Sequence, residues 1–189
     1  MDVQRLAIPG AALLTRRLYV DRRGDWSELY HRETLASLGF DAEYVQDNAS
    51  TSARGVLRGL HFQHPHPQAK LVTVVSGSVF DVCVDVRVGS PTFGTWFGAT
   101  LSAENGQQML IPPGCAHGFL SLRDGSVTVY KVSGAWMPEV ERVVNWKDPV
   151  LGIHWPIEVE PVLCDRDADA PTLAHLDANG LLPRFSGSA

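Results

Sequence analysis

The chain has 189 residues, of which 44% are hydrophobic and 20% are charged, and its formal net charge is −5. This length fits one domain that buries a continuous core without disulfides or structural metals. The negative charge argues against a general nucleic-acid-binding protein, because phosphate neutralisation needs clustered lysines and arginines. One anionic small ligand is compatible with it, since two or three cations suffice; the candidates are Arg22, Arg23, Arg58 and Lys70.

Cysteine usage and hydropathy bear on the compartment. Cys83, Cys115 and Cys164 are odd in number, widely separated and without CxxC spacing, so we expect reduced packing residues. The apolar segment 7–14 is short and interrupted by Pro-Gly, so no signal peptide is expected. No apolar run approaches the length that spans a bilayer. These features predict a cytoplasmic protein with no membrane partner.

In chain order, residues 15–20 are expected to be extended. Asp25 to Leu38 carries leucines at roughly helical spacing before Gly39, which predicts a short helix. From Tyr44 to about Val132 the chain consists of short segments rich in Val, Phe, Thr and Tyr, punctuated by turn residues, and this predicts a β core over 44–132. Strands are expected at 70–75, 79–86, 93–101, 108–111, 118–122 and 127–132.

Two details of this β region concern its topology. The sequence Ser76-Gly77-Ser78 between the first two strands predicts a hairpin with a positive φ at Gly77. Turn signals about every ten residues favour a sandwich or barrel over a parallel sheet with crossover helices. In the second strand an apolar face alternates with a polar one. The apolar residues are Phe80, Val82, Val84 and Val86, and the polar-face residues are Asp81, Cys83 and Asp85.

The C-terminal segment, about 148–183, is rich in Pro and Asp and too poor in apolar residues to form a second domain. We expect it to wrap around the barrel. A short helix is predicted near Thr172 to Asn179, ended by Gly180. Residues 1–189 are therefore predicted to form a single domain.

The densest group of polar side chains runs from Arg58 to Lys70. Taken alone, His61 in this run fits a structural or surface histidine more readily than a base. Strict strand alternation places Arg58 and His61 on opposite faces, so both can serve one pocket only if Gly59 hosts a bulge or the strand ends there.

A metal site is the first alternative. The PxGxxH spacing that ends at His117 resembles the second cupin signature, and His64 with His66 supplies an HxH pair. Such sites also need a Glu a few residues after the HxH pair, whereas Lys70 and its neighbours stand there. A cation argues against a metal ligand, so His64 and His66 are interpreted as loop residues. No metal and no cofactor are predicted.

Five motifs follow one another along the chain: Tyr44–Asn48, Ser52–Gln63, Gly77–Asp85, Gly89–Gly94 and Ala116–Phe119. Together, from about Asp21 to Pro171, the chain resembles the dTDP-4-dehydrorhamnose 3,5-epimerase family. The resemblance implies a mainly β, double-stranded β-helix (cupin jelly roll) with short flanking helices. It also implies a cofactor-independent epimerase that inverts carbons 3 and 5 of dTDP-4-keto-6-deoxy-D-glucose, giving dTDP-4-keto-L-rhamnose.

The resemblance also implies roles for individual residues. His61 would be the base, Asp167 the carboxylate that orients it, Tyr130 the acid on the opposite face and Lys70 the group that stabilises the enolate oxygen. Without the resemblance, Tyr130 fits a barrel tyrosine, Lys70 a solvated strand end and Asp167 a surface-loop acid. Substrate binding is assigned to Arg23, Glu28, Gln46, Asn48 and Arg58 for the nucleotide and diphosphate, and to His117 for the sugar.

The resemblance implies a homodimer that exchanges strand-edge segments. Two positions depart from the family pattern, because Trp136 stands where Tyr is common and Arg166 stands where Lys is common. Three alternatives therefore stay open: an epimerase acting on carbon 3 or carbon 5 alone, a metal-dependent cupin isomerase or dioxygenase, and a non-catalytic sugar-binding cupin.

Overall fold

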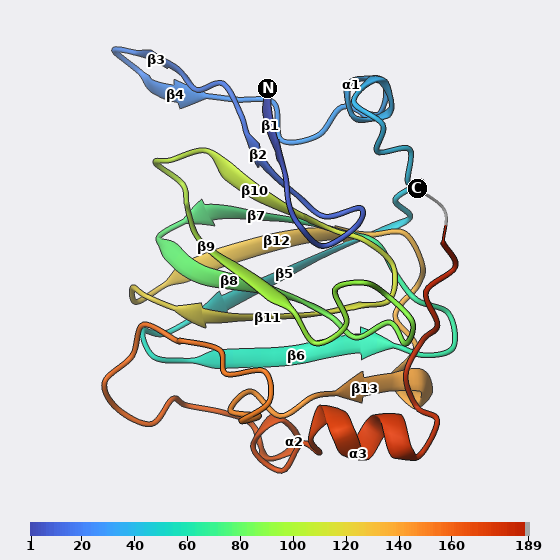
Figure 1. Ribbon diagram of the computed structural model, residues 1–189. Coiled ribbons are helices and arrows are strands. Elements are labelled where there is room, and N and C mark those ends of the chain that lie inside the picture. The colour runs from blue at the N-terminus through green and yellow to red at the C-terminus, as the bar shows by residue number, and fades with distance from the viewer. Residues whose placement is uncertain (188–189) are drawn as a thin grey trace.

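Two antiparallel sheets face each other in the computed structural model, which describes residues 1–187 (Figure 1). Residues 188–189, the end of the predicted single domain, lie outside the described part. The six-stranded sheet has the order β1 (Asp2–Arg5), β2 (Ala12–Thr15), β10 (Gln107–Ile111), β7 (Lys70–Ser76), β12 (Ser126–Val132) and β5 (Gln46–Ser52). The five-stranded sheet has the order β13 (Glu141–Val143), β6 (Leu57–Gln63), β11 (Cys115–Ser121), β8 (Ser78–Asp85) and β9 (Trp96–Ser102).

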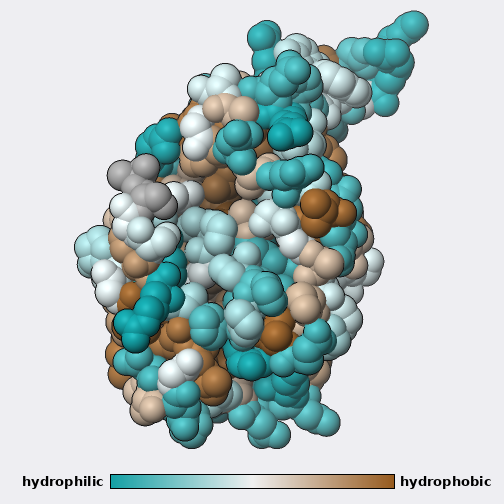
Figure 2. Space-filling model, turned by 90° about the vertical axis from the view of Figure 1, so that its right-hand side faces the viewer, coloured by the Kyte–Doolittle hydropathy of each residue, from teal (hydrophilic) through white to brown (hydrophobic). Residues whose placement is uncertain are grey.

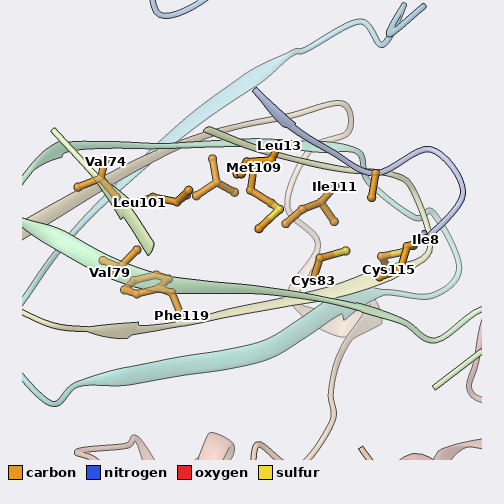
Figure 3. Close-up of a cluster of buried hydrophobic side chains, with 12 residues drawn as sticks. Ile8, Leu13, Val74, Val79, Cys83, Leu101, Met109, Ile111, Cys115 and Phe119 are labelled. Atoms are coloured by element: carbon orange, nitrogen blue, oxygen red, sulfur yellow. The ribbon is translucent and has the colours of Figure 1, made fainter. Parts of the chain in front are cut away.

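The main core fills the space between the two sheets. Figure 3 shows Leu13, Met109 and Ile111 of the six-stranded sheet directed toward Cys83 and Phe119 of the five-stranded sheet. Each of these five side chains is less than 10% exposed. Burying such side chains stabilises the fold by about 1.5–3 kcal/mol each, so this layer holds the sheets together.

A second apolar cluster lies on the outer side of the five-stranded sheet. The apolar face of β8, including Val82 and Val84, packs there against Leu173 and Leu176 of α3 (Leu173–Ala178). The hydroxyl oxygen of Thr172 accepts a hydrogen bond from the first turn of this helix, as an N-cap does. The helix expected near residues 172–179 is confirmed. Because the tail covers the apolar face of β8, the opposite face, with its aspartates, is the one directed between the sheets.

The predicted hairpin at Gly77 is wrong. All six predicted strands exist, and their ends lie within three residues of the expected ones, but β7 and β8 belong to different sheets. Gly77 has a positive φ of 71°, as expected, and a side chain there would lie 2.6 Å from the Ser126 hydroxyl oxygen. The turn therefore carries the chain from one sheet to the other rather than pairing the strands it joins.

The helix predicted over 25–38 is shorter than expected, because α1 spans only Arg32–Ser37 and buries Leu35. It is followed by Gly39 at φ 88°, as predicted. Asp25 and Trp26, at the expected start of the helix, instead belong to β4 (Gly24–Trp26), which pairs with β3 (Tyr19–Asp21) in an arm that extends from the top of the molecule (Figure 1). The leucine spacing does not extend the helix, because Leu35 is the only α1 side chain that is buried in the core.

Outside the sheets the structure is short and irregular. A 3-10 helix, η1 (Pro138–Val140), precedes β13, and α2 (Asp165–Ala168) precedes α3. The face in Figure 2 carries hydrophobic side chains in small, separate groups among hydrophilic ones. No helix within residues 1–187 combines the length and apolar character needed to cross a membrane.

Candidate active site

A polar cavity of about 370 Å³ opens between the two sheets. Seven of the ten predicted site residues line it, and Asp167 lies directly behind His61. The lining residues are Gln46, Asn48, Ser50, Arg58, His61, Gln68, Lys70, His117, Phe119, Tyr130, Val132, Trp136, Glu141 and Arg166.

Arg58 and His61 reach the same cavity because β6 carries a bulge. Arg58 pairs with Phe119 and His61 pairs with His117, so three steps along β6 match two along β11. The extra residue lies at Gly59–Leu60, where the alternation of faces is reset. Gly59 has a φ of 126°, and a side chain there would lie 2.5 Å from the Gly118 Cα. The bulge that Arg58 and His61 need in order to share one pocket therefore exists, and its backbone conformation is one that only glycine accommodates.

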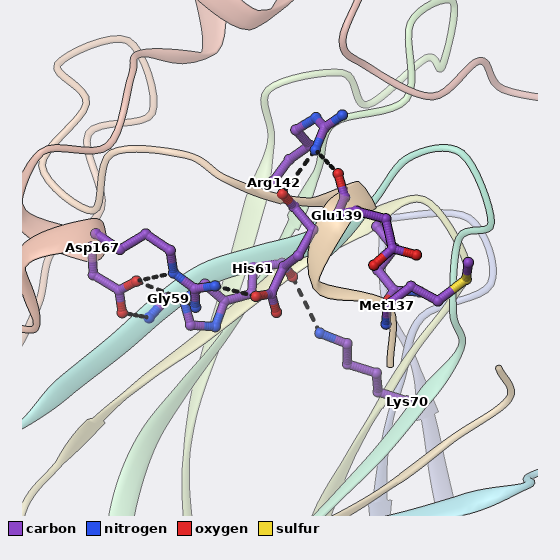
Figure 4. A network of polar contacts seen from close by, with 10 residues as sticks. Gly59, His61, Lys70, Met137, Glu139, Arg142 and Asp167 are labelled. Atoms are coloured by element: carbon purple, nitrogen blue, oxygen red, sulfur yellow. Dashed lines mark hydrogen bonds and ion pairs between the residues drawn. The ribbon is translucent and has the colours of Figure 1, made fainter. Parts of the chain in front are cut away.

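His61 and Asp167 form a hydrogen-bonded dyad (Figure 4). The His61 Nε2 lies 2.8 Å from the Asp167 Oδ1, and the Gly59 backbone N–H donates to the Asp167 Oδ2 at 3.0 Å. Burial by itself raises the pKa of Asp167, but the hydrogen bonds from His61 and Gly59 and the charge of Arg166 bring the pKa below its ordinary value. An ionised carboxylate only accepts, so Nε2 carries the hydrogen and Nδ1 keeps a free lone pair.

Lys70 enters the cavity from the six-stranded sheet. Its side chain is buried, not a solvated strand end, and its Nζ donates to the His61 carbonyl oxygen at 3.2 Å (Figure 4). Burial lowers the pKa of Lys70 to about 8, against the opposing charges of Glu141 and Asp81. The ammonium is therefore still protonated near pH 7 and is held where it can face a developing negative charge.

Tyr130 lies on the same sheet as Lys70, across the cavity from the strand that carries His61. Its ring centroid is 6.3 Å from that of His117. Burial raises the pKa of Tyr130, so the hydroxyl keeps its proton and can donate it. Gln46 and Asn48 on the neighbouring β5 are hydrogen-bonded to each other at 2.7 Å and give this wall a polar end.

Three further residues border the cavity beside the dyad. Arg166 ion-pairs with Glu141, and its Nη2 is 3.2 Å from the His61 Nε2. The Trp136 backbone N–H donates to the Gln46 side-chain oxygen at 3.0 Å, and about half of the Trp136 residue surface is exposed. Arg166 and Trp136 were noted in the sequence as departures. Glu141 was missed, because nothing distinguishes this acid from its neighbours until β13 places it beside β6.

Arg23 and Glu28 lie away from the cavity in this single chain. Arg23 stands on the arm with 83% of its side chain exposed, and it pairs with Asp21 at 2.6 Å. Glu28 is exposed in the segment after the arm. The chain by itself therefore does not bring these two predicted nucleotide-binding residues to the other eight.

The histidines of the metal alternative are not gathered at one site. His66 is exposed, and neither His64 nor His66 lines the cavity, whereas His117 does. Within residues 1–187 no group of three or more His, Cys, Asp or Glu side chains is arranged to hold a metal ion.

The fold and the cavity define a double-stranded β-helix protein with a histidine–carboxylate dyad on one wall of the cavity and a lysine and a tyrosine on the facing wall. The family model of dTDP-4-dehydrorhamnose 3,5-epimerase matches residues 5–175. The chain therefore belongs to the dTDP-4-dehydrorhamnose 3,5-epimerase family, a family of epimerases, and the predicted cupin-type fold and family are confirmed.

Individual relatives agree with this assignment. A dTDP-4-dehydrorhamnose 3,5-epimerase of Pseudomonas aeruginosa is 47% identical over 178 residues, covering 94% of this chain and 98% of the relative. One of Neisseria gonorrhoeae is 45% identical over 96% of this chain, which spans only 55% of that relative's length.

Solved structures extend the comparison to bound sugars. A dTDP-6-deoxy-D-glucose-3,5-epimerase from Legionella pneumophila in complex with dTDP-4-keto-L-rhamnose has a TM-score of 0.94 and 42% identity, over 98% of this chain and 99% of that one. A 3'-monoepimerase from Streptomyces bikiniensis in complex with dTDP-quinovose has a TM-score of 0.89 and 42% identity, over 95% and 91%.

Proposed function

We propose that this protein is an epimerase that converts dTDP-4-keto-6-deoxy-D-glucose into dTDP-4-keto-L-rhamnose by inverting carbons 3 and 5. The observation that carries the proposal is the His61–Asp167 dyad on one wall of the cavity, with Lys70 and Tyr130 on the facing wall. The family membership and the Legionella pneumophila complex support the substrate class.

The chemistry follows from the ketone at carbon 4. A hydrogen on carbon 3 or 5 lies next to this carbonyl, so its removal as a proton gives an enolate rather than a bare carbanion. The lone pair on the His61 Nδ1 takes the proton, and the Asp167 carboxylate stabilises the resulting imidazolium. Lys70 faces the enolate oxygen with its positive charge. Both electrons of the broken C–H bond stay on the sugar, so no redox coenzyme is required.

Inversion requires a new proton from the opposite side of the sugar. Tyr130 lies on the wall that faces His61 and holds its proton because burial raises its pKa. When the enolate collapses, the Tyr130 hydroxyl donates this proton to carbon. The His61 imidazolium then loses its proton to solvent, and the Tyr130 phenolate takes one from solvent, which restores both groups. The same pair of groups serves both carbons if the sugar presents each in turn.

Positional deuterium exchange tests the proposal. Incubation of the protein with dTDP-4-keto-6-deoxy-D-glucose in heavy water is expected to place deuterium at carbons 3 and 5, as read by NMR. The matched control is dTDP-quinovose, a 6-deoxy sugar without the activating ketone, which should take up none. Absence of label from the keto substrate at both carbons would rule out the epimerase and leave a sugar-binding role.

The second candidate is a mono-epimerase. It is favoured by the similarity to the Streptomyces bikiniensis 3'-monoepimerase and by Trp136 and Arg166, two departures that both line the cavity. Their bulk and charge would hold the sugar with only one carbon near His61. Label at a single carbon in the same experiment identifies this activity.

We further propose that the protein acts as a homodimer in the cytoplasm, and that the partner's arm completes the site. The arm exposes Tyr19, Val20 and Trp26, large apolar side chains that are costly to leave in water. In a dimer with exchanged arms, Arg23 of one copy would reach the nucleotide in the cavity of the other. Cys83 and Cys115 are buried free thiols, which suits a reducing compartment.

Analytical ultracentrifugation tests the dimer. Trp26→Ala is expected to shift the protein toward monomer and to weaken binding of dTDP, whereas Val162→Ala, at another exposed apolar residue far along the chain, should change neither. A Trp26→Ala protein that stays dimeric and binds dTDP normally would contradict the exchanged arm.

A further inference from the structure

A second histidine–carboxylate pair lies beside the first. His117 is directly opposite His61 across β11 and β6, so both side chains project from the same face of the sheet. The His117 Nε2 is 2.7 Å from the Asp81 Oδ1, which repeats the contact between His61 and Asp167. The mechanism above uses the first pair and leaves Asp81 without a role.

Asp81 is as deeply buried as Asp167, the carboxylate of the first dyad. It is 0% exposed, and its Oδ2 has no hydrogen-bond partner within residues 1–187. A buried carboxylate oxygen without a hydrogen-bond partner destabilises the fold, because it has lost its hydration without compensation. The nearby charge that offsets this cost is Lys70, whose ammonium ion Asp81 in turn favours. The Asp81 Oδ1 therefore contacts His117, while the Oδ2 is left without a hydrogen bond within the described residues.

The contact with Asp81 decides which nitrogen of His117 carries hydrogen. A carboxylate accepts, so Nε2 must be the N–H, and burial lowers the pKa of His117 so that the ring is neutral. Nδ1 then holds a lone pair and has no hydrogen-bond partner among the described residues. Since His117 lines the cavity, Nδ1 is the atom available to a ligand.

Several side-chain acceptors in the cavity lining already have partners. Glu141 is paired with Arg166, the Asn48 oxygen accepts from Gln46, and the Gln46 oxygen accepts from the Trp136 N–H. The oxygens of Ser50, Gln68 and Tyr130 remain, along with the His117 Nδ1, as acceptors for a ligand. A hexose with a ketone at carbon 4 still carries hydroxyl groups, each of which needs an acceptor once water is excluded. His61 cannot serve, because its free lone pair is needed for the proton on carbon.

We propose that Asp81 is a positioning residue that holds His117 as the Nε2–H tautomer, so that Nδ1 accepts a hydrogen bond from a sugar hydroxyl near the ketone. The inference deepens the proposed function and rests on it for the identity of the sugar. It assigns the two dyads different work, because one takes a proton from carbon and the other recognises a hydroxyl without changing its protonation.

The first test needs no variant. Nitrogen-15 NMR of the wild-type protein at pH 7 is expected to show His117 as the neutral Nε2–H tautomer, with its ring signals assigned through bonds from its own backbone resonances. Asp81→Asn should abolish this preference at His117 and leave His61 unchanged, while Asp167→Asn should do the reverse. A wild-type His117 that is cationic, or protonated on Nδ1, overturns the proposal even if every variant fails to fold.

The second test measures recognition without turnover. Calorimetry would compare dTDP-quinovose with its 2-deoxy and 3-deoxy counterparts, none of which has a ketone. We expect wild type to bind one deoxy compound about tenfold more weakly, and Asp81→Asn to lose this discrimination while Asp167→Asn keeps it. Equal discrimination by wild type and Asp81→Asn, or none in wild type, contradicts the role of Asp81. Because deuterium exchange by wild type is measured separately, failure here is distinct from failure of the epimerase.

Discussion

The two walls of the cavity differ in how their polar side chains are held. On the five-stranded sheet, His61 and His117 each give Nε2 to a buried carboxylate, which leaves an accepting nitrogen on each ring. On the six-stranded sheet, Lys70 and Tyr130 make no ion pair within residues 1–187, and each keeps its proton near pH 7. Acceptors therefore face donors, which is the arrangement needed to remove a proton from one face of the sugar and add another to the opposite face.

The largest effect is expected from His61→Asn, which removes the base but keeps a polar side chain. Turnover should fall by roughly 10³–10⁴-fold, and deuterium uptake should stop at carbons 3 and 5 together. Calorimetric binding of dTDP, unchanged in the variant, would show that the cavity is intact. Turnover within tenfold of wild type would place the base elsewhere.

Tyr130→Phe removes the proposed acid from the facing wall and should affect inversion more than proton exchange. Loss of the acid is expected to lower inversion by about 10²–10³-fold, while His61 still removes protons and returns solvent deuterium to the same face. Exchange into unreacted substrate would therefore continue after inversion has nearly stopped. If exchange and inversion fall together, the distinction between the walls does not hold.

Asp167→Asn separates the orienting carboxylate from the base. An amide in place of the carboxylate no longer fixes the His61 tautomer or stabilises the imidazolium, so kcat is expected to fall roughly 10²-fold or more. KM should change little, because Asp167 lies behind His61 and does not line the cavity. A rise in KM with unchanged kcat would contradict this role.

The pH dependence reports on Lys70. Its pKa is lowered to about 8, and the protonated form is the useful one, so activity is expected to fall about tenfold per pH unit above about pH 8 as the ammonium loses its proton. Removing a nearby negative charge lowers this pKa further, so Glu141→Gln should move the basic limb of kcat/KM to lower pH. If the basic limb of kcat/KM does not move in Glu141→Gln, the limb reports the titration of a group other than Lys70.

The smallest effect concerns the bulge that brings Arg58 and His61 to one cavity. Gly59→Ala is expected to lower the free energy of unfolding by about 2–4 kcal/mol, from a strained φ plus a collision with the Gly118 Cα. Gly55→Ala is the matched control, because Gly55 also has a positive φ but no atom within 4 Å. It should cost only about 1 kcal/mol. Equal losses in urea unfolding would show that strain alone matters.

Local pattern was sufficient for some features and misleading for others. The strands were predicted because alternation and turn residues are local signals, but the Gly77 turn resembled a hairpin although it joins two sheets. The helix predicted from Asp25 begins only at Arg32, and Trp26 at its expected start instead pairs with Tyr19, a contact that forms only after the chain has turned. The apolar face of β8 was recognised, but whether it faces the core or the tail depended on residues some ninety positions later.

By itself the sequence determined the family, the β class and the candidate residues, because these rest on local periodicity and on motifs in a fixed order. The roles given to His61, Asp167, Lys70 and Tyr130 remain predictions, although one cavity now contains or adjoins all four. Only the tertiary structure decided that a bulge turns Arg58 toward His61, that Glu141 joins them, and that Asp81 holds His117. The reason is that these contacts join residues far apart in the chain. Their existence depends on which strands pair and in what register, and no local pattern encodes that choice.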